Sequence, residues 1–154
     1  METGFQNQSV DVRTFDGADD TLLDPIFFLS PSGIWYAAPI GSTTDGLSTP
    51  RIIRNLPGYD ATGEDWMSGV LHDSAYRDML LVWNDRTTTP DLELTPSNLT
   101  GWRQAHLTQK QSDRLILDAM TTQGVGFFRR HIIYYALRLF GSFAFKEDRK
   151  NNLK

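Results

Sequence analysis

The sequence predicts an α+β fold in which a small antiparallel sheet or hairpin in the N-terminal third packs on three or four helices. Short β-rich runs separated by turns with Gly and Pro lie early in the chain, and apolar residues at helical spacing dominate from residue 64 onward. The chain has 154 residues, of which 40% are hydrophobic, which is enough for one core. We therefore expect one domain over residues 1–154, with a polar N-terminal segment at 1–9 and a charged C-terminal tail at 146–154.

Two β-rich runs are expected to form a hairpin. Residues 26–29 (Ile-Phe-Phe-Leu) and 34–37 (Ile-Trp-Tyr-Ala) flank the turn sequence Ser-Pro-Ser-Gly at 30–33. Before them, residues 10–15 alternate apolar and polar side chains, which indicates a half-buried strand. Residues 16–20 have the composition of a turn.

A helix is predicted over residues 64–83. Its apolar positions roughly follow the helical period and are Trp66, Val70, Leu71, Ala75, Met79 and Leu80. The polar runs at 41–50 and 58–63 before this helix, and at 84–97 after it, are predicted to be loops.

Three further segments are interpreted as helices. The first is a short one at residues 98–107. The sequence from Thr108 to Gln111 has the spacing of a capping box, and Gly124 suits a C-terminal stop, so these residues delimit the next helix. The last helix is expected over residues 126–145.

The composition excludes several classes of protein. Because the chain has no cysteine, it forms no disulfide and no thiolate metal site. The formal net charge of −4 makes nucleic acid an unlikely partner. The polar start lacks the basic and apolar regions of a signal peptide, and no window of 18 apolar residues predicts a membrane span.

The residues that could carry chemistry centre on His72. On a helix, His72 and Tyr76 share a face because they are four residues apart, and Asp73 lies one step around. A His beside an Asp could supply a general base and a ligand for a hard metal. Asp113 and Asp45 are the distant carboxylates that could complete a site for calcium, magnesium or manganese.

Each of these residues also has a structural interpretation. A His-Asp pair on a helix is commonly a hydrogen-bonding pair. Asp113 could compensate the positive end of its helix, and Asp45 could stabilise a turn. His106 is expected to lie on the surface. A network that ties the loop to two helices would stabilise the fold without any activity.

Three blocks of sequence resemble the phage-associated family called domain of unknown function 1353. They are a T-D-x-x-S-x-P loop at 44–50, an H-D-x-x-Y-R helix at 72–77, and an Asp followed by an A-M…G-V segment at 113–125. The resemblance implies a phage or prophage origin but no activity. The residues that it places in one site are Asp45, Ser48, His72, Asp73, Tyr76 and Asp113, with Thr44 in the supporting loop.

The H-D-x-x-Y helix also resembles that of secreted phospholipases A2. This similarity implies that His72 activates water, that Asp73 holds calcium, and that Asp113 orients His72 with help from Tyr76. The chain departs from that family because it has neither cysteines nor the family's glycine-rich calcium loop.

Two functions follow as expectations. The first is a virion component of the tail or baseplate that carries a His-Asp metal-dependent hydrolase site for lipid esters or the cell envelope. The second is a purely structural phage protein. Other phage structural proteins are the expected partners, in the virion or the host cytoplasm. The basic, aromatic helix around Phe127–Phe140 is either a core helix or an interfacial helix that contacts a membrane, an envelope or a partner.

Overall fold

The computed structural model describes residues 2–7, 11–14, 20–44, 66–95 and 97–152. Within them the chain forms two antiparallel sheets and three helices. The larger sheet has the order β1 (Gly4–Phe5), β4 (Ile26–Leu29), β5 (Trp35–Ala38), β7 (Leu81–Trp83) and β8 (Trp102–Gln104). The smaller sheet has the order β2 (Val12–Thr14), β3 (Asp20–Leu22) and β6 (Thr43–Thr44). The helices are α2 (Trp66–Tyr76), α3 (Gln109–Thr122) and α4 (Phe127–Asn152). The α+β prediction is confirmed.

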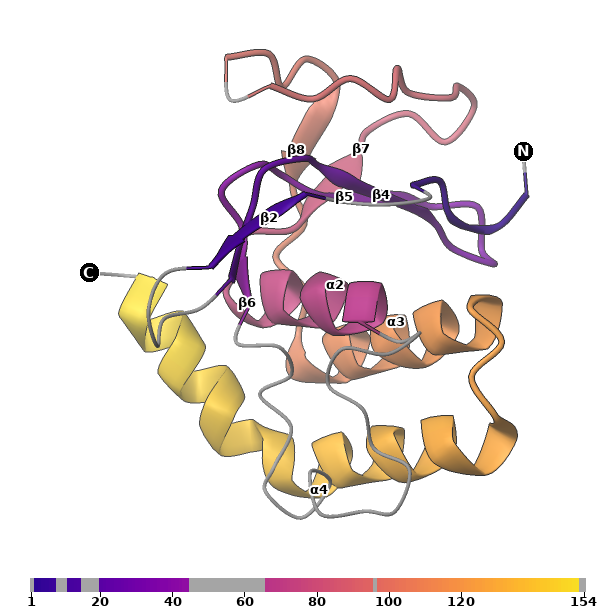
Figure 1. Ribbon diagram of the computed structural model, residues 1–154, viewed down its shortest axis with the longest axis vertical. Helices are drawn as coiled ribbons and strands as arrows, with labels where there is room; N and C mark the ends of the chain where they lie inside the picture. Colours follow the sequence, from indigo (N-terminus) through magenta and orange to yellow (C-terminus); the bar gives the residue numbers. More distant parts are fainter. Residues whose placement is uncertain (1, 8–10, 15–19, 45–65, 96, 153–154) are drawn as a thin grey trace.

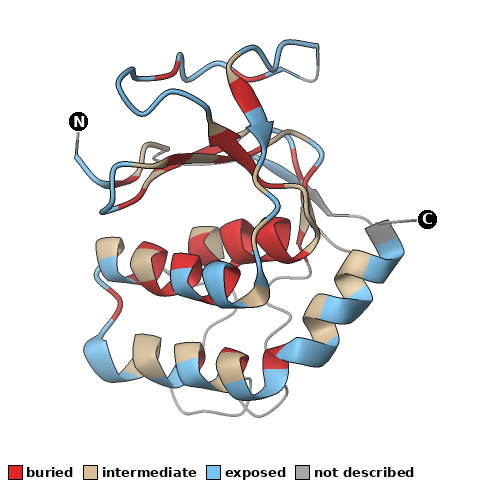
Figure 2. Ribbon diagram, turned by 180° about the vertical axis from the view of Figure 1, so that it is seen from behind, coloured by how far each residue is buried: buried red, intermediate tan, exposed pale blue. Residues whose placement is uncertain are grey.

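The elements are stacked in layers (Figure 1). The segment between β7 and β8 covers one side of the larger sheet, α2 and α3 cover the other, and α4 lies beyond these two helices. Helix α2 is buried along most of its length, whereas α4 exposes much of its surface (Figure 2). Polar side chains on α2 that face away from the sheet are therefore enclosed by other helices.

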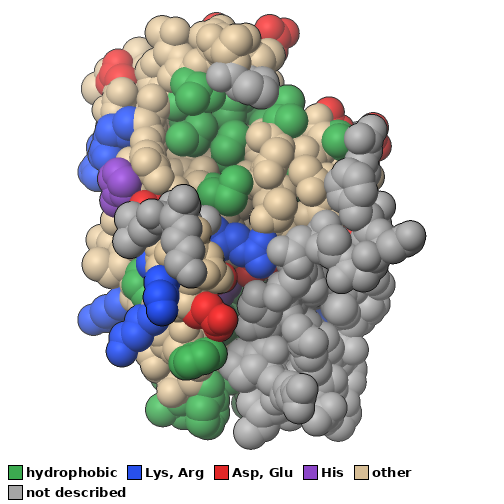
Figure 3. Space-filling view, turned by 90° about the vertical axis from the view of Figure 1, so that its left-hand side faces the viewer, with side chains coloured by type: hydrophobic (Ala, Val, Ile, Leu, Met, Phe, Trp, Pro, Cys, Tyr) green, Lys and Arg blue, Asp and Glu red, His purple; other side chains and the backbone are tan. Residues whose placement is uncertain are grey.

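Helix α4 bends near its middle (Figure 1). Its sequence contains the pair Gly141 and Ser142, and such pairs are a common cause of helix kinks. The bend turns its C-terminal part toward the end of α2. There Arg149 forms an ion pair with Asp78, and basic and acidic side chains lie side by side on that face of the molecule (Figure 3).

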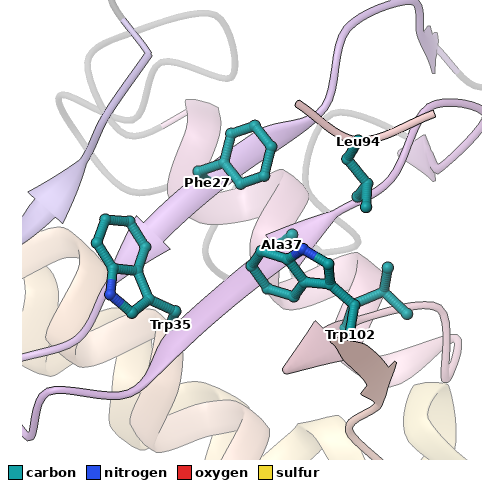
Figure 4. Packing of buried hydrophobic residues seen from close by; sticks show 6 residues of the cluster. Phe27, Trp35, Ala37, Leu94 and Trp102 are labelled. Atoms are coloured by element: carbon teal, nitrogen blue, oxygen red, sulfur yellow. The ribbon is translucent and has the colours of Figure 1, made fainter. Parts of the chain in front are cut away.

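The core has a part on each face of the larger sheet. On the outer face, Phe27, Trp35 and Trp102 gather with Leu94 from the covering segment (Figure 4). On the inner face, Phe28 packs against residues of α2 and α3 that include Leu71 and Leu115. The adjacent residues Phe27 and Phe28 point to opposite faces, as the two-residue period of a strand requires.

The predicted hairpin is confirmed. β4 pairs with β5 in the antiparallel register Leu29–Trp35 to Ile26–Ala38. In the turn, the amide of Ser30 donates to the carbonyl of Ile34, and the carbonyl of Ser30 accepts from the amide of Gly33. Gly33 has a φ of 81°, which favours glycine. The strand expected at 10–15 is present as β2, although Val10 and Phe15 lie outside the described residues.

The prediction of a helix as far as residue 83 was wrong. Helix α2 ends at Tyr76, and Leu81–Trp83 form strand β7. Asp78 takes a left-handed conformation with a φ of 59°. The amide of Met79 then donates to the carbonyl of Ser74, and that of Asp78 to the carbonyl of Ala75, which is a Schellman motif with Asp in the place of the usual Gly.

Other boundaries also differ from the predictions. No helix occurs at 98–107, where the described chain forms β8 instead. The expected charged tail is helical to Asn152, the polar N-terminal segment contributes β1, and the loop expected at 41–50 begins with β6. Asp20, placed in a turn, starts β3. The loop predicted at 58–63 lies outside the described residues.

Helix α3 has the ends that the sequence predicts. The Thr108 hydroxyl accepts from the amide of Gln111, and the Gln111 side chain accepts from the amide of Thr108, which completes the capping box. After the helix, Gly124 has a φ of 77°. These caps fix the start of α3 and thereby the position of Asp113 on its second turn. Among the described residues, no helix combines the length and the apolar character needed to cross a membrane.

Candidate functional site

The candidate site is a buried polar cluster where α2, α3 and α4 meet. His72, Asp73 and Tyr76 come from α2, Asp113 from α3, and Arg138 from α4. The first four are at most 3% exposed. Burying polar groups costs free energy unless they are hydrogen-bonded, so the hydrogen-bond partners of these side chains have to be identified first.

Asp113 is the centre of the cluster and accepts three hydrogen bonds. The Tyr76 hydroxyl donates to Oδ1 at 2.6 Å, and His72 Nε2 lies 3.1 Å from the same oxygen. Arg138 Nη1 donates to Oδ2 at 2.9 Å. Because a carboxylate only accepts, Nε2 of His72 carries the hydrogen of this contact.

The contacts shift the pKa values of the cluster. Burial alone would raise the pKa of the Asp113 carboxyl, but the bonds from His72, Tyr76 and Arg138 outweigh it and hold this pKa below the ordinary value. Burial lowers the pKa of His72, but the neighbouring carboxylates of Asp113 and Asp73 outweigh it and raise this pKa above 6.5. Burial also raises the pKa of Tyr76, so its hydroxyl stays protonated and donates.

The other edge of the imidazole faces Asp73. His72 Nδ1 lies 3.9 Å from Asp73 Oδ1, which is beyond hydrogen-bond distance, and no described residue hydrogen-bonds to Nδ1. Asp73 Oδ2 accepts a hydrogen bond from the Thr44 hydroxyl at 2.6 Å, which links β6 to α2. With Nε2 bonded to Asp113, Nδ1 is the nitrogen that could accept a proton.

Gly141 lets α4 approach the cluster closely. A Cβ at this position would lie 2.6 Å from the Tyr76 hydroxyl oxygen. On the other side, the rings of His72 and Tyr76 have centroids 4.0 Å apart. Tyr76 is therefore held between the imidazole and the backbone of α4.

The structure brings together the predicted residues His72, Tyr76 and Asp113, with Asp73 and Thr44 beside them. Asp45 and Ser48 lie outside the described residues. His106 is exposed, as expected, and pairs with Asp78 away from the cluster.

Sequence reasoning missed Arg138 and Gly141. The signal for Arg138 was available only in part, because a buried carboxylate needs a cation or several donors but the sequence does not say which arginine supplies them. Gly141 gave no sequence signal beyond a glycine inside a helix, which costs about 1 kcal/mol relative to Ala and so suggests a packing reason.

The expected cation has few ligands here. Both oxygens of Asp113 are taken up by hydrogen bonds. Among the residues that the structure describes, no group of three or more His, Asp or Glu side chains is arranged to hold a metal ion. Asp73 is the carboxylate of the cluster that could still contribute a ligand.

Two pockets lined entirely by described residues lie elsewhere. One, of about 320 Å³, is lined by residues of the β4–β5 turn, of β5 and of α3, including Ser30, Tyr36 and Arg114. The other, of about 280 Å³, lies beside Asn7, Asp24 and Leu92. Neither includes a residue of the cluster.

Comparison with protein families matches residues 21–137 to the family described as "Protein of unknown function (DUF1353)". The matched range contains every residue of the cluster except Arg138, and it ends before Gly141. No curated protein and no solved structure matches the chain.

Proposed function

The chain belongs to the protein family of unknown function DUF1353, and we propose that His72 is the general base of a hydrolase, oriented by Asp113. The observation that supports this is the bonding of Asp113, whose Oδ1 fixes Nε2 of the imidazole, while Nδ1 lies 3.9 Å from Asp73 and forms no hydrogen bond with a described residue. An imidazole held in one tautomer by a buried carboxylate is a recurrent device for activating water.

The proposed step is the hydrolysis of an ester. Nδ1 of His72 takes a proton from water as the water oxygen bonds to the acyl carbon. The bond from that carbon to the alkoxy oxygen then breaks, and the imidazolium returns the proton to the departing alcohol. Asp113 stabilises the imidazolium without taking the proton, and Tyr76 and Arg138 keep Asp113 ionised.

The sequence resemblance to a phage-associated family is the basis for proposing a virion component of the tail or baseplate as the carrier of this activity. Lipid esters and the host cell envelope are then the substrate classes to test. A divalent cation (calcium, magnesium or manganese) would use Asp73, and the proposed proton transfer does not depend on it.

A hydrolase screen with matched variants tests the proposal. Wild type, His72→Gln, Asp113→Asn and the control His106→Gln are assayed on phospholipid and peptidoglycan substrates, each with EDTA and with added calcium, magnesium or manganese. We expect His72→Gln to lose activity by about 10²–10⁴-fold, the usual contribution of a general base, and His106→Gln to keep it. Equal activity in folded His72→Gln and wild type would refute the assignment.

The burial of the cluster favours a second candidate, a structural phage protein. A catalytic histidine must be reached by water and substrate, yet His72 is 3% exposed. Labelling with diethyl pyrocarbonate separates the two, with His106 and His131 as internal controls. Modification of native His72 supports the hydrolase. Labelling of His72 only on unfolding, with no activity on any substrate, supports the structural role.

A further inference from the structure

Exposed large hydrophobic side chains are concentrated on α4. Seven of the eleven in the described residues lie on this helix. They are Phe127, Phe128, Ile132, Tyr135, Leu139, Phe140 and Phe143, with exposures of 48–79%. Scattered apolar residues on a surface need no explanation, but a concentration of this kind commonly marks an interaction site.

Four of these side chains form a continuous stripe. Phe128, Ile132, Tyr135 and Leu139 are spaced by four, three and four residues, which places them on one face of a helix. The opposite face of the same part of α4 packs in the core through Ile133 and Leu137. The core interpretation of this helix is thus confirmed for one face, and the apolar stripe on the other face belongs to no core cluster of the described residues.

The charge of α4 is opposite to that of the rest of the chain. The helix has six Lys or Arg and two Asp or Glu, a formal charge of +4. The remainder has nine basic and 17 acidic residues, a formal charge of −8. Lys146 and Lys150 in the C-terminal part are exposed. Arg138 and Arg149 are paired with Asp113 and Asp78, so the other four cations of α4 give an acidic protein one basic, apolar edge.

From this edge we infer that α4 binds an anionic lipid surface, with the stripe of Phe128, Ile132, Tyr135 and Leu139 inserted among the lipids. An amphipathic helix with aromatic residues on one side and cations around them lies in the plane of a membrane interface in this way. Anionic headgroups complement the charge of α4, at about 1 kcal/mol for each Lys or Arg near the surface. A second copy would bring the basic edges of two molecules together, which their like charges oppose.

The binding is independent of the proposed hydrolase, because the stripe and His72 are on different helices and face different surroundings. A His72→Gln variant should therefore bind lipid as wild type does. Failure of the activity assay would leave this inference intact, and failure of lipid binding would leave the His72 assignment intact.

The test is co-sedimentation with vesicles of mixed phosphatidylcholine and phosphatidylglycerol, compared with phosphatidylcholine alone. We expect binding to the anionic vesicles that weakens with added salt, since surface charges are screened. The double variant Phe128→Ser/Leu139→Ser should lose binding by at least tenfold. The matched control Leu23→Ser/Leu99→Ser changes two leucines of similar size that are 43% and 42% exposed outside α4, and should bind as wild type.

Charge is tested separately with Lys146→Glu/Lys150→Glu, for which we expect a loss of at least tenfold on anionic vesicles. Circular dichroism of each variant checks that it is folded. The inference is overturned if wild type does not bind, or if it binds neutral and anionic vesicles equally. It is also overturned if analytical ultracentrifugation shows a dimer that Phe128→Ser/Leu139→Ser dissociates while vesicle binding is unchanged.

Discussion

At the scale of residues, Asp113 explains why its own carboxylate can be buried together with His72 and Tyr76. Its two oxygens accept from a tyrosine, a histidine and an arginine that come from two other helices. Removal of one member of such a network leaves the others without a partner, and a broken buried ion pair costs about 3–5 kcal/mol. The network therefore stabilises the packing of α2, α3 and α4 whether or not it is catalytic.

The raised pKa of His72 predicts how stability depends on pH. A group whose pKa is higher in the folded state than in the unfolded state binds its proton more tightly when folded. The contribution of His72 to the free energy of unfolding is complete below pH 6.5, the pKa of an unfolded histidine. It is lost as the pH rises through the pKa that His72 has in the folded state. The pKa of Asp113 is lower in the folded state than its ordinary value of 3.8. Its contribution to the free energy of unfolding is therefore lost only in acid, as the pH falls from 3.8 through the folded value.

We expect the free energy of unfolding of wild type, relative to His72→Gln, to be largest near pH 5.5 and to decrease toward pH 9. Urea denaturation at several pH values measures this difference. The replacement His131→Gln controls for the loss of a histidine on the surface of α4. A difference that grows with pH would contradict the assignment of His72 to a site between two carboxylates.

The same titration predicts the pH profile of the proposed hydrolase. Only neutral His72 can accept a proton from water, so activity should rise as the pH increases through the folded pKa. Stability and activity then change in opposite directions across one titration. A purely structural network would show the stability change alone.

At the scale of elements, the close approach of α4 to α2 depends on a missing side chain. Gly141→Ala would place a Cβ 2.6 Å from the Tyr76 hydroxyl oxygen, and α4 or Tyr76 must then move. We expect a destabilisation of about 1–3 kcal/mol, the usual cost of overpacking. Thermal or urea denaturation measures it.

Two variants make this prediction specific. Tyr76→Phe removes the hydroxyl that the new Cβ would meet, so Gly141→Ala should cost less in that background than in wild type. Gly126→Ala, where nothing lies within 4 Å of the added Cβ, should be close to neutral. An equal cost of Gly141→Ala with and without the Tyr76 hydroxyl would show that the contact is not the cause.

The elements were predictable where local signals were unambiguous. The hairpin followed from two β-rich runs around a Pro/Gly turn, and α3 followed from its capping box and Gly124. Helix α2 was extended too far because its end is marked by Asp78, a residue that adopts a left-handed φ less readily than Gly. The strand β8 was mistaken for a helix because pairing with β7, a tertiary contact, determines it.

The candidate site was also predictable only where local sequence signals identify its residues. The spacing of His72 and Tyr76 places both on one helix face. Asp113 was named from its place near the start of the capped helix, and the family resemblance pointed to it as well. The cation that neutralises Asp113 could not be found, because Arg138 lies 25 residues away on another helix. A sequence specifies such a partner only through the packing of whole helices.

At the scale of the whole molecule, the C-terminal part of α4 joins segments that are far apart in the chain. Arg149 donates hydrogen bonds to the carbonyls of Ala75, Tyr76 and Leu107. Two of these carbonyls belong to the last turn of α2, where backbone acceptors have no partner within the helix. One arginine thus caps α2 and ties it to the residue before the cap of α3.

Arg149→Ala should therefore destabilise the whole fold rather than only the end of α4. Hydrogen bonds from a charged donor contribute about 1.5–3 kcal/mol, and the side chain is 24% exposed, so we expect a loss at the lower end of that range. Lys150→Ala, the adjacent exposed cation, should change stability by no more than about 0.5 kcal/mol. Hydrogen exchange locates the effect, since amides of α2 should exchange faster in Arg149→Ala. If faster exchange is confined to the last turns of α4, this arginine anchors only its own helix, and its bonds do not hold the three helices together.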